Sequence, residues 1–144
     1  MSFLSKATAA HCAQIAEQLN QAKKLAQTNR RIETVIEFLQ ANVHLDLPLD
    51  FIAKEAGLSS PRLRGLFKES TGISLGHYLK LLRLETARRL LEDGFPTIQE
   101  VMDRVGIHDL SHFNRDFKAV YEVTPAKYRD HYRRNLDILD IVSE

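Results

Sequence analysis

A histidine pair is the first feature that could do chemistry, because two histidines four residues apart share one face of a helix and can bind a metal ion. His108 and His112 have this spacing, but no third ligand is evident beside them. Serine, histidine and aspartate residues occur without a nucleophile elbow or a glycine-rich phosphate loop. The only cysteine, Cys12, has no basic neighbour apart from His11, which predicts an unreactive thiol. We therefore expect no enzyme activity, no metal site and no cofactor.

Basic side chains are the other candidates, because lysine and arginine can bind nucleic-acid phosphates. The net charge does not argue for or against nucleic-acid binding, since the chain has 20 Lys and Arg, 19 Asp and Glu and a formal charge of +1. Several of them fall into short clusters: Arg62 with Arg64 and Lys68, Arg88 with Arg89, and Arg133 with Arg134. Such clusters are either binding surfaces or solvated helix faces, and the charge balance does not separate the two.

The elements that position these residues are predicted to be helices. The 144 residues make one ordinary domain or two very small ones, and only 6 glycines and 4 prolines interrupt a composition that favours helix. No apolar stretch approaches the roughly 20 residues of a membrane span, and the N-terminus has no signal-peptide core. A single cysteine excludes a disulfide framework. We expect an all-α, cytoplasmic protein that does not span a membrane.

The first basic cluster falls within a predicted helix-turn-helix unit, from about residue 49 to residue 72. Pro48 and Asp50 end the preceding helix and cap the first helix of the unit, residues 51–56, which ends at Gly57. The second helix begins with Ser59 and Pro61 and ends at Gly72. Two short helices joined by a tight turn that contains glycine are typical of this motif.

A longer helix is predicted over residues 74–93, capped by Ser74. Leu82 and Leu91 belong to its main apolar stripe, whereas Leu81 and Leu84 lie off that stripe. A helix that is apolar on more than one side is usually buried on more than one side. This pattern predicts a rod held by a subdomain at each end.

The helix-turn-helix pattern then repeats over about residues 97–120. Thr97 and Glu100 form a capping box, and Asp109 caps the helix after it. At an offset of 50 residues, Leu63, Phe67, Lys68, Ser74 and Tyr78 match Phe113, Phe117, Lys118, Thr124 and Tyr128. The sequence therefore predicts a duplicated unit on a central helix.

Four motifs in the two units resemble the DNA-binding domain of the AraC/XylS family of bacterial transcription regulators: the A-G-L-S turn, the L-F-K-E-x-T-G helix end, the R-L-x-x-A-R-x-L-L linker helix, and F-x-R-x-F-K followed by T-P-x-x-Y-R. The resemblance runs from about Ile32 to Arg133, within a domain taken as residues 30–134. It implies a sequence-specific regulator that places two recognition helices in successive major grooves of double-stranded DNA.

The resemblance also implies which residues meet DNA, in the second helix of each unit, residues 60–69 and 109–119. Arginine can fork onto guanine O6 and N7, and asparagine can pair with adenine. Arg115 stands where the family commonly has a base-contacting arginine. The candidate set is Ser60, Arg62, Arg64, Lys68, Ser111, His112, Asn114, Arg115 and Lys118. Each of these residues could instead be a solvated side chain on an amphipathic helix.

Three features depart from the family pattern. Gly65 stands where the first recognition helix often carries an arginine, so the first unit is expected to read fewer bases or to allow close backbone approach. Glu122 replaces the glycine usual after the second recognition helix, and a left-handed residue there is strained unless the helix end is rearranged. The near-neutral charge and an acidic tail at residues 135–144 predict weaker non-specific DNA binding than in strongly basic relatives.

The sequence leaves several alternatives open. Residues 1–29 form an N-terminal helical extension, with a break predicted at Thr28 and Asn29, that fits a solvent-facing helix, a linker remnant or a dimerisation arm. The chain is either a stand-alone regulator, compatible with a monomer, or the DNA-binding part of a longer one. RNA polymerase is an expected partner. The alternative function is a helical module that binds RNA polymerase or another regulator, with DNA contact secondary.

Overall fold

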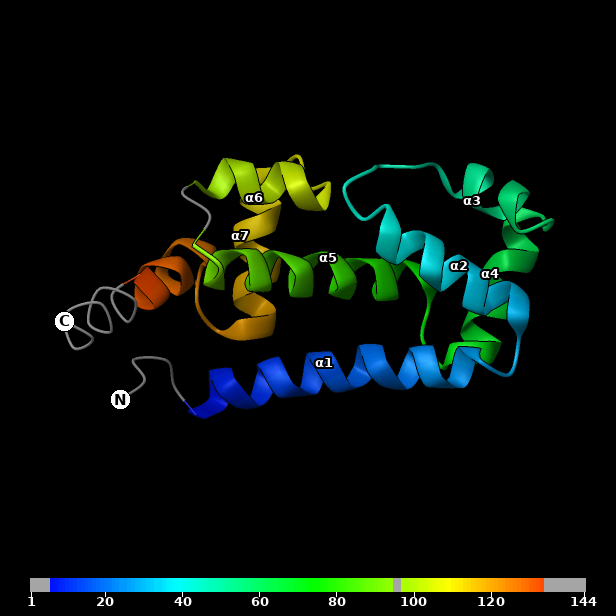
Figure 1. The fold of residues 1–144 in the computed structure, drawn as a ribbon, viewed down its shortest axis with the longest axis horizontal. Coiled ribbons are helices and arrows are strands. Elements are labelled where there is room, and N and C mark those ends of the chain that lie inside the picture. The colour runs from blue at the N-terminus through cyan, green and yellow to red at the C-terminus, as the bar shows by residue number, and fades with distance from the viewer. Residues whose placement is uncertain (1–5, 95–96, 134–144) are drawn as a thin grey trace.

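The computed structural model describes residues 6–94 and 97–133, and every regular element in these two stretches is a helix (Figure 1). In chain order the helices are α1 (Lys6–Ala26), α2 (Arg30–Ala41), α3 (Leu49–Glu55), α4 (Ser60–Thr71), α5 (Leu75–Glu92), α6 (Ile98–Val105) and α7 (Leu110–Tyr121). Residues 125–133 are also helical. The expected all-α class is confirmed, with helix-turn-helix units α3–α4 and α6–α7 joined by α5. The acidic tail at residues 135–144 lies outside the described residues.

Within the described stretches, no helix is both long enough and apolar enough to cross a bilayer.

The helices begin at side chains that satisfy free backbone N–H groups, as the sequence predicts. Ser59, Ser74, Thr97 and Asp109 each accept a hydrogen bond from the N–H three residues later. The break before α2 is confirmed in the same way, because the Asn29 side chain accepts from the N–H groups of Arg31 and Ile32.

The start of α3 differs from the prediction. The helix begins at Leu49, with Pro48 as its N-cap and no side-chain cap bond. Asp50 therefore lies in the first turn, where its carboxylate accepts the hydroxyl hydrogen of Ser60 from α4. The predicted capping role of Asp50 is wrong, because this contact between the two helices of the unit occupies its side chain.

Helix α5 is buried on two sides, because each half of it completes a different core. Leu75, Tyr78 and Leu82 belong to the first core, with α2, α3 and α4. Leu81 and Leu84 belong to the second core, with α6, α7 and residues 125–133. The two leucines off the main stripe are 2% and 1% exposed, which confirms the predicted rod between two subdomains.

Helix α1 packs along both units and does not stand free in solvent. It runs beside α5 in Figure 1 and contacts α4, α5 and α7. Ile15 belongs to the second core and Ala22 and Ala26 to the first, while Leu19 packs against both. This packing rules out the solvent-facing alternative for α1. A dimerisation role stays a prediction.

The end of α7 keeps the left-handed geometry without a glycine. Glu122 has φ +70°, and it is the one non-glycine residue with positive φ in the described stretches. Its N–H donates to the Lys118 carbonyl, as the N–H of Gly72 does to Lys68 at the end of α4. Non-glycine residues tolerate this conformation at a cost of about 1–2 kcal/mol. The helix end is therefore strained and not rearranged.

We expect Phe67→Ala and Phe117→Ala each to lower the free energy of unfolding by roughly 3–5 kcal/mol, measured in thermal or denaturant melts. Both rings are fully buried, one in each small core, so their removal leaves cavities. Phe51→Ala is the matched control, because that ring is 44% exposed. Its cost should be about 1 kcal/mol or less. Equal melts for all four proteins would contradict the assignment of the helical faces.

Candidate nucleic-acid interface

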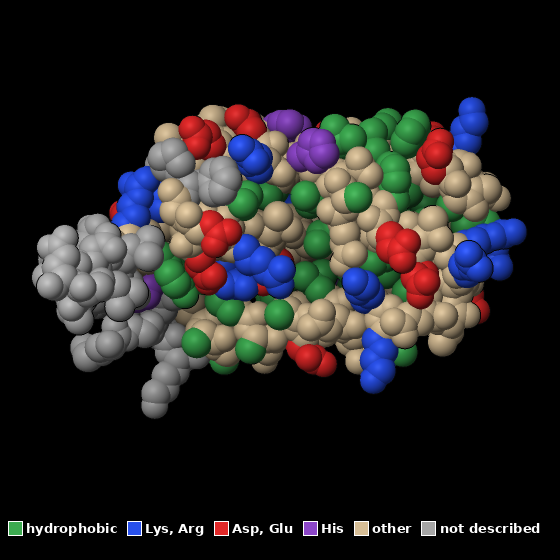
Figure 2. Space-filling model, in the orientation of Figure 1, with side chains coloured by type: hydrophobic (Ala, Val, Ile, Leu, Met, Phe, Trp, Pro, Cys, Tyr) green, Lys and Arg blue, Asp and Glu red, His purple; other side chains and the backbone are tan. Residues whose placement is uncertain are grey.

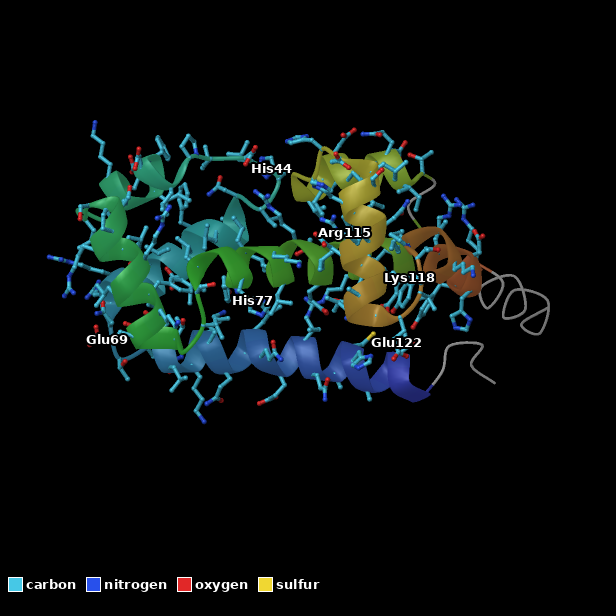
Figure 3. All side chains as sticks on the ribbon, turned by 180° about the vertical axis from the view of Figure 1, so that it is seen from behind. His44, Glu69, His77, Arg115, Lys118 and Glu122 are labelled. Atoms are coloured by element: carbon cyan, nitrogen blue, oxygen red, sulfur yellow. The ribbon has the colours of Figure 1, made fainter. Side chains whose placement is uncertain are left out.

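The two candidate recognition helices lie on one side of the molecule. Figure 3 shows α7 in front of the second half of α5, and α4 beside the start of α5 and in front of α2. Each helix follows the turn of its own unit and presents one face to a core. The opposite faces therefore point away from α5 and are free to meet a common ligand.

Helix α4 separates its core face from its solvent face cleanly. Leu63, Leu66 and Phe67 are buried, whereas Arg62, Arg64 and Lys68 are exposed. Both arginines and the lysine are thus accessible to DNA. Ser60 differs, since it is half-buried and its hydroxyl donates to Asp50. In this arrangement Ser60 ties α4 to α3.

Helix α7 has the same construction. Phe113, Phe117 and Tyr121 point into the second core. The candidate residues around the rest of the helix are Ser111, His112, Arg115 and Lys118, which are exposed, and Asn114, which is half-buried. Asn114 lies at the border between the core face and the solvent face.

The first turn of α7 is held by Asp109. Its carboxylate accepts the His112 N–H at 2.9 Å. This hydrogen bond is the main cause that lowers the pKa of the Asp109 carboxyl. The leading turn, which carries Ser111 and His112, is therefore capped by a fixed negative charge. Residues in this turn are those that a recognition helix brings to base edges.

Among the described residues, the basic groups of this face form only exposed ion pairs, which DNA can displace. The Arg115 Nε atom lies 3.5 Å from Asp116 Oδ1, and the Lys80 Nζ atom lies 3.7 Å from the same oxygen. The Arg115 side chain is 67% exposed. Surface pairs of this kind contribute about 0–1 kcal/mol, so a phosphate or a guanine edge can displace them.

The two helices are not equivalent at the centre of their outer faces. The repeat offset that aligns Phe67 with Phe117 aligns Gly65 with Arg115. A Cβ atom at Gly65 would meet nothing within 4 Å. Beside it lies an open groove of about 800 Å³. Its apolar lining consists of Leu47, Leu49, Ile52, Leu75 and Leu79, and its charged residues are Arg64, Lys68 and Glu69. The first helix thus presents a hollow where the second presents a guanidinium.

The face of the molecule in Figure 2 carries mixed charge. Lys and Arg side chains are interspersed with Asp and Glu over its surface. This mixture agrees with the net charge of +1, and the face in Figure 2 is the one opposite to the view of α4 and α7 in Figure 3.

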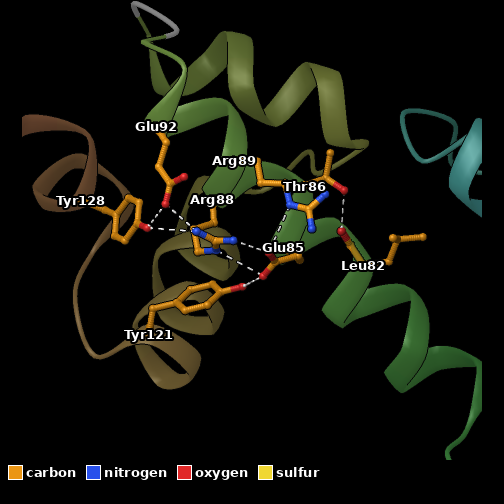
Figure 4. Close-up of polar contacts among 8 residues, drawn as sticks. All are labelled: Leu82, Glu85, Thr86, Arg88, Arg89, Glu92, Tyr121 and Tyr128. Atoms are coloured by element: carbon orange, nitrogen blue, oxygen red, sulfur yellow. Dashed lines mark hydrogen bonds and ion pairs between the residues drawn. The ribbon is translucent and has the colours of Figure 1, made fainter. Parts of the chain in front are cut away.

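A buried polar network links α5 to α7, and sequence reasoning missed it. Arg88 forms ion pairs with Glu85 and Glu92 of its own helix, and Tyr121 of α7 donates to Glu85 at 3.0 Å (Figure 4). Tyr128 donates to Glu92. The available signal was the spacing of Glu85, which stands three and four residues before Arg88 and Arg89.

Burial sets the electrostatics of this network. The Glu85 side chain is 4% exposed and that of Arg88 is 14% exposed. Burial by itself lowers the pKa of Arg88, but hydrogen bonds to Glu85 and Tyr128 outweigh it and raise the pKa. Burial and the Glu85 charge together raise the pKa of Tyr121, so it stays a hydroxyl donor. The C-terminal end of α7 is therefore anchored to the central helix.

Sequence reasoning also missed Leu110. This residue is 53% exposed in the first turn of α7, next to Ser111 and His112. No pattern in the sequence predicts this exposure, because Leu110 shares with Phe113 and Phe117 the i, i+3 and i+7 spacing that is typical of a buried stripe. An exposed apolar side chain at this place can contact a thymine methyl group.

Two helix-turn-helix units on one central helix define a class of DNA-binding domain. Residues 52–131 match the family of helix-turn-helix domains. The chain is 30% identical over 99 residues to the multiple antibiotic resistance protein MarA of Escherichia coli, covering 68% of this chain and 77% of MarA. The chain belongs to the AraC/XylS family of transcription regulators.

Two further comparisons define the extent of the likeness. The chain is 30% identical over 102 residues to the transcriptional activator RhaR of Pectobacterium atrosepticum, but spans 36% of its length. The DNA-binding domain of the global transcriptional factor AdpA, solved in complex with a target DNA, superposes with a TM-score of 0.67 at 25% identity. That match covers 72% of this chain and 94% of the AdpA domain.

We expect Arg88→Ala to lower the free energy of unfolding by about 3–5 kcal/mol, because it leaves the Glu85 carboxylate buried without its main partner. Arg89→Ala is the matched control. Arg89 also pairs with Glu85, but its side chain is 67% exposed, so its removal should cost about 1 kcal/mol or less. Denaturant melts of both variants measure the difference. Equal effects would show that the buried pair contributes no more than the exposed one.

Proposed function

We propose that this chain binds duplex DNA with α4 and α7 in successive major grooves, and that it selects its site by sequence. The observation that carries the proposal is the shared side of the two recognition helices, each with aromatic residues inward and basic residues outward. The 18 residues of α5 span about 27 Å at 1.5 Å per residue. Successive major grooves on one face of DNA are separated by about 34 Å. The length of α5 together with the width of the two helix-turn-helix units can span this distance. The DNA complex of the AdpA domain supports the same reading.

The proposed roles divide the candidate residues by chemistry. Arg115 and Arg64 contact base edges, since a guanidinium matches guanine O6 and N7. Lys68 and Lys118 lie one turn later in each helix and contact phosphates. Ser111, His112 and Asn114 contact bases or backbone from α7, and Arg62 does so from α4. Ser60, whose hydroxyl hydrogen is donated to Asp50, contacts DNA as a hydrogen-bond acceptor. We propose a function in binding and not in catalysis.

The wider role of the chain is also a proposal. A bacterial regulator of transcription acts in the cytoplasm and meets RNA polymerase, and we propose both for this protein. One copy carries two recognition helices, so it can fill a complete site as a monomer. Since the chain spans 36% of RhaR and 77% of MarA, the effector and the direction of regulation in those proteins do not transfer to it.

A second candidate function is protein binding, and the apolar groove beside α4 favours it. The groove is mainly apolar and is bordered by Arg64, Lys68 and Glu69, which suits an apolar segment of RNA polymerase with an acidic side chain facing the two basic residues. DNA and such a segment would compete for the same two residues. Binding of random duplex at several salt concentrations separates the functions, because phosphate contacts give a steep salt slope and protein binding alone gives none.

We expect one monomer to protect a non-palindromic site of about 20 base pairs, because the two recognition helices differ in sequence and enter grooves one helical turn apart. Selection from a random DNA pool followed by footprinting measures this. A symmetric site that holds one half-site per monomer would contradict the proposal.

We expect Arg115→Ala to lose about 1–3 kcal/mol on the selected site and to relax the preference at one or two base pairs. Arg64→Ala should have a smaller effect, because Gly65 leaves the first recognition helix with fewer reading groups. Lys68→Ala should weaken all sequences alike and reduce the salt slope by about one unit. Titrations on selected and scrambled duplexes at two salt concentrations measure all three. Full sequence preference in Arg115→Ala would remove α7 from the sequence readers.

A further inference from the structure

The loop between α2 and α3, residues 42–48, belongs to the first unit but touches the second. Val43 and Leu47 pack against the first core. At Gly106, the turn between α6 and α7 comes so close that an added Cβ would lie 2.9 Å from the Val43 carbonyl oxygen and 3.1 Å from that of His44. The two units therefore meet backbone to backbone at this point, with no side chain between them.

Arg83 holds this loop from the central helix. Its Nη2 atom donates to the Leu45 carbonyl oxygen at 3.1 Å and lies 4.0 Å from the Asp46 carboxylate. The Arg83 side chain is 17% exposed, whereas Asp46 is 69% exposed. The bond to the carbonyl is the shorter of the two and thus the main contact, and it does not depend on which side chain stands at position 45.

The loop and α1 lie on opposite sides of α5. Figures 1 and 3 both show α1 along one side of the central helix and the loop that contains His44 along the other. Helix α1 contributes residues to both cores, and the loop bridges the same two units. Contacts on two opposite sides of a rod restrain bending and twisting, while contacts on one side leave a hinge.

We infer that Arg83 is a positioning residue that fixes the distance and angle between α4 and α7, and thereby the spacing between half-sites that the protein accepts. The inference rests on the proposed function, because it concerns DNA read by both helices at once. Adding one base pair moves the second half-site by about 3.4 Å and rotates it by about 35° around the DNA axis. A rigid pair of units cannot follow this change, but a hinged pair can.

The experiment uses the full chain and a site selected from random DNA by the wild-type protein. Duplexes carry that site unchanged, or with one base pair added or removed between its halves. We expect wild-type protein to bind the altered duplexes at least about tenfold more weakly, because the second unit loses its base contacts. Failure of the wild-type protein to select any site would overturn the proposed function before Arg83 is tested.

For Arg83→Ala we expect this spacing penalty to fall to about threefold or less, with unchanged base preferences in each half-site. Asp46→Ala is the matched control, since it removes the exposed ion pair and leaves the carbonyl bond, and it should keep the wild-type penalty. Arg83→Met retains the buried stem of the side chain, so it replaces the alanine variant if that variant does not fold. The same fall in the spacing penalty is expected for it.

Three results would overturn the inference. The first is a wild-type spacing penalty in both Arg83 variants. The second is an equal loss of affinity for all three duplexes, which a purely destabilised protein would show. The third is a failure of both variants to fold, which would assign Arg83 to folding and not to spacing.

Discussion

The structure depends on the double burial of α5, because neither helix-turn-helix unit closes a core by itself. Tyr78 and Leu82 complete one core and Leu84 and Leu91 the other, so two small subdomains share one helix. Small subdomains bury too little surface to be stable alone. Sharing α5 solves this problem and places α4 and α7 near the two ends of the same rod. The geometry proposed for DNA binding thus follows from the way the cores are filled.

The buried charges of α5 are paired. The Glu85 and Arg88 groups leave water together, and Tyr121 ties them to the end of α7. The basic residues proposed to meet DNA are exposed, held at most by weak surface pairs. The same residue types therefore have two roles, set by burial: network charges hold the recognition helix in place, and exposed charges are free to exchange partners.

The duplication has not kept the two recognition helices equal. Gly65 lines a groove at the position that corresponds to Arg115 in the second unit. Glu122 adopts a left-handed backbone conformation that is strained for a residue with a side chain, whereas Gly72 adopts it without strain. The second unit is thus richer in the groups proposed to read bases, and the first offers an apolar hollow bordered by Arg64, Lys68 and Glu69. Unequal halves suit a non-palindromic site, because each half can be read with different strength.

The sequence by itself determined the features that depend on neighbours within a turn or two. The caps at Ser59, Ser74, Thr97 and Asp109, the left-handed end at Gly72 and the inward faces of Phe67 and Phe117 follow from spacings of three or four residues. Only the tertiary structure decided four other contacts. These are the hydrogen bond from Ser60 to Asp50, the packing of α1 on both units, the hydrogen bond from Tyr121 to Glu85 and the hydrogen bond from Arg83 to the Leu45 carbonyl. The three hydrogen bonds join residues 10 to 38 positions apart, and α1 packs against α5 and α7, which lie still farther along the chain, so no local pattern encodes these contacts. They form because folding brings the two units onto one helix, where a buried charge or a free carbonyl must find a partner.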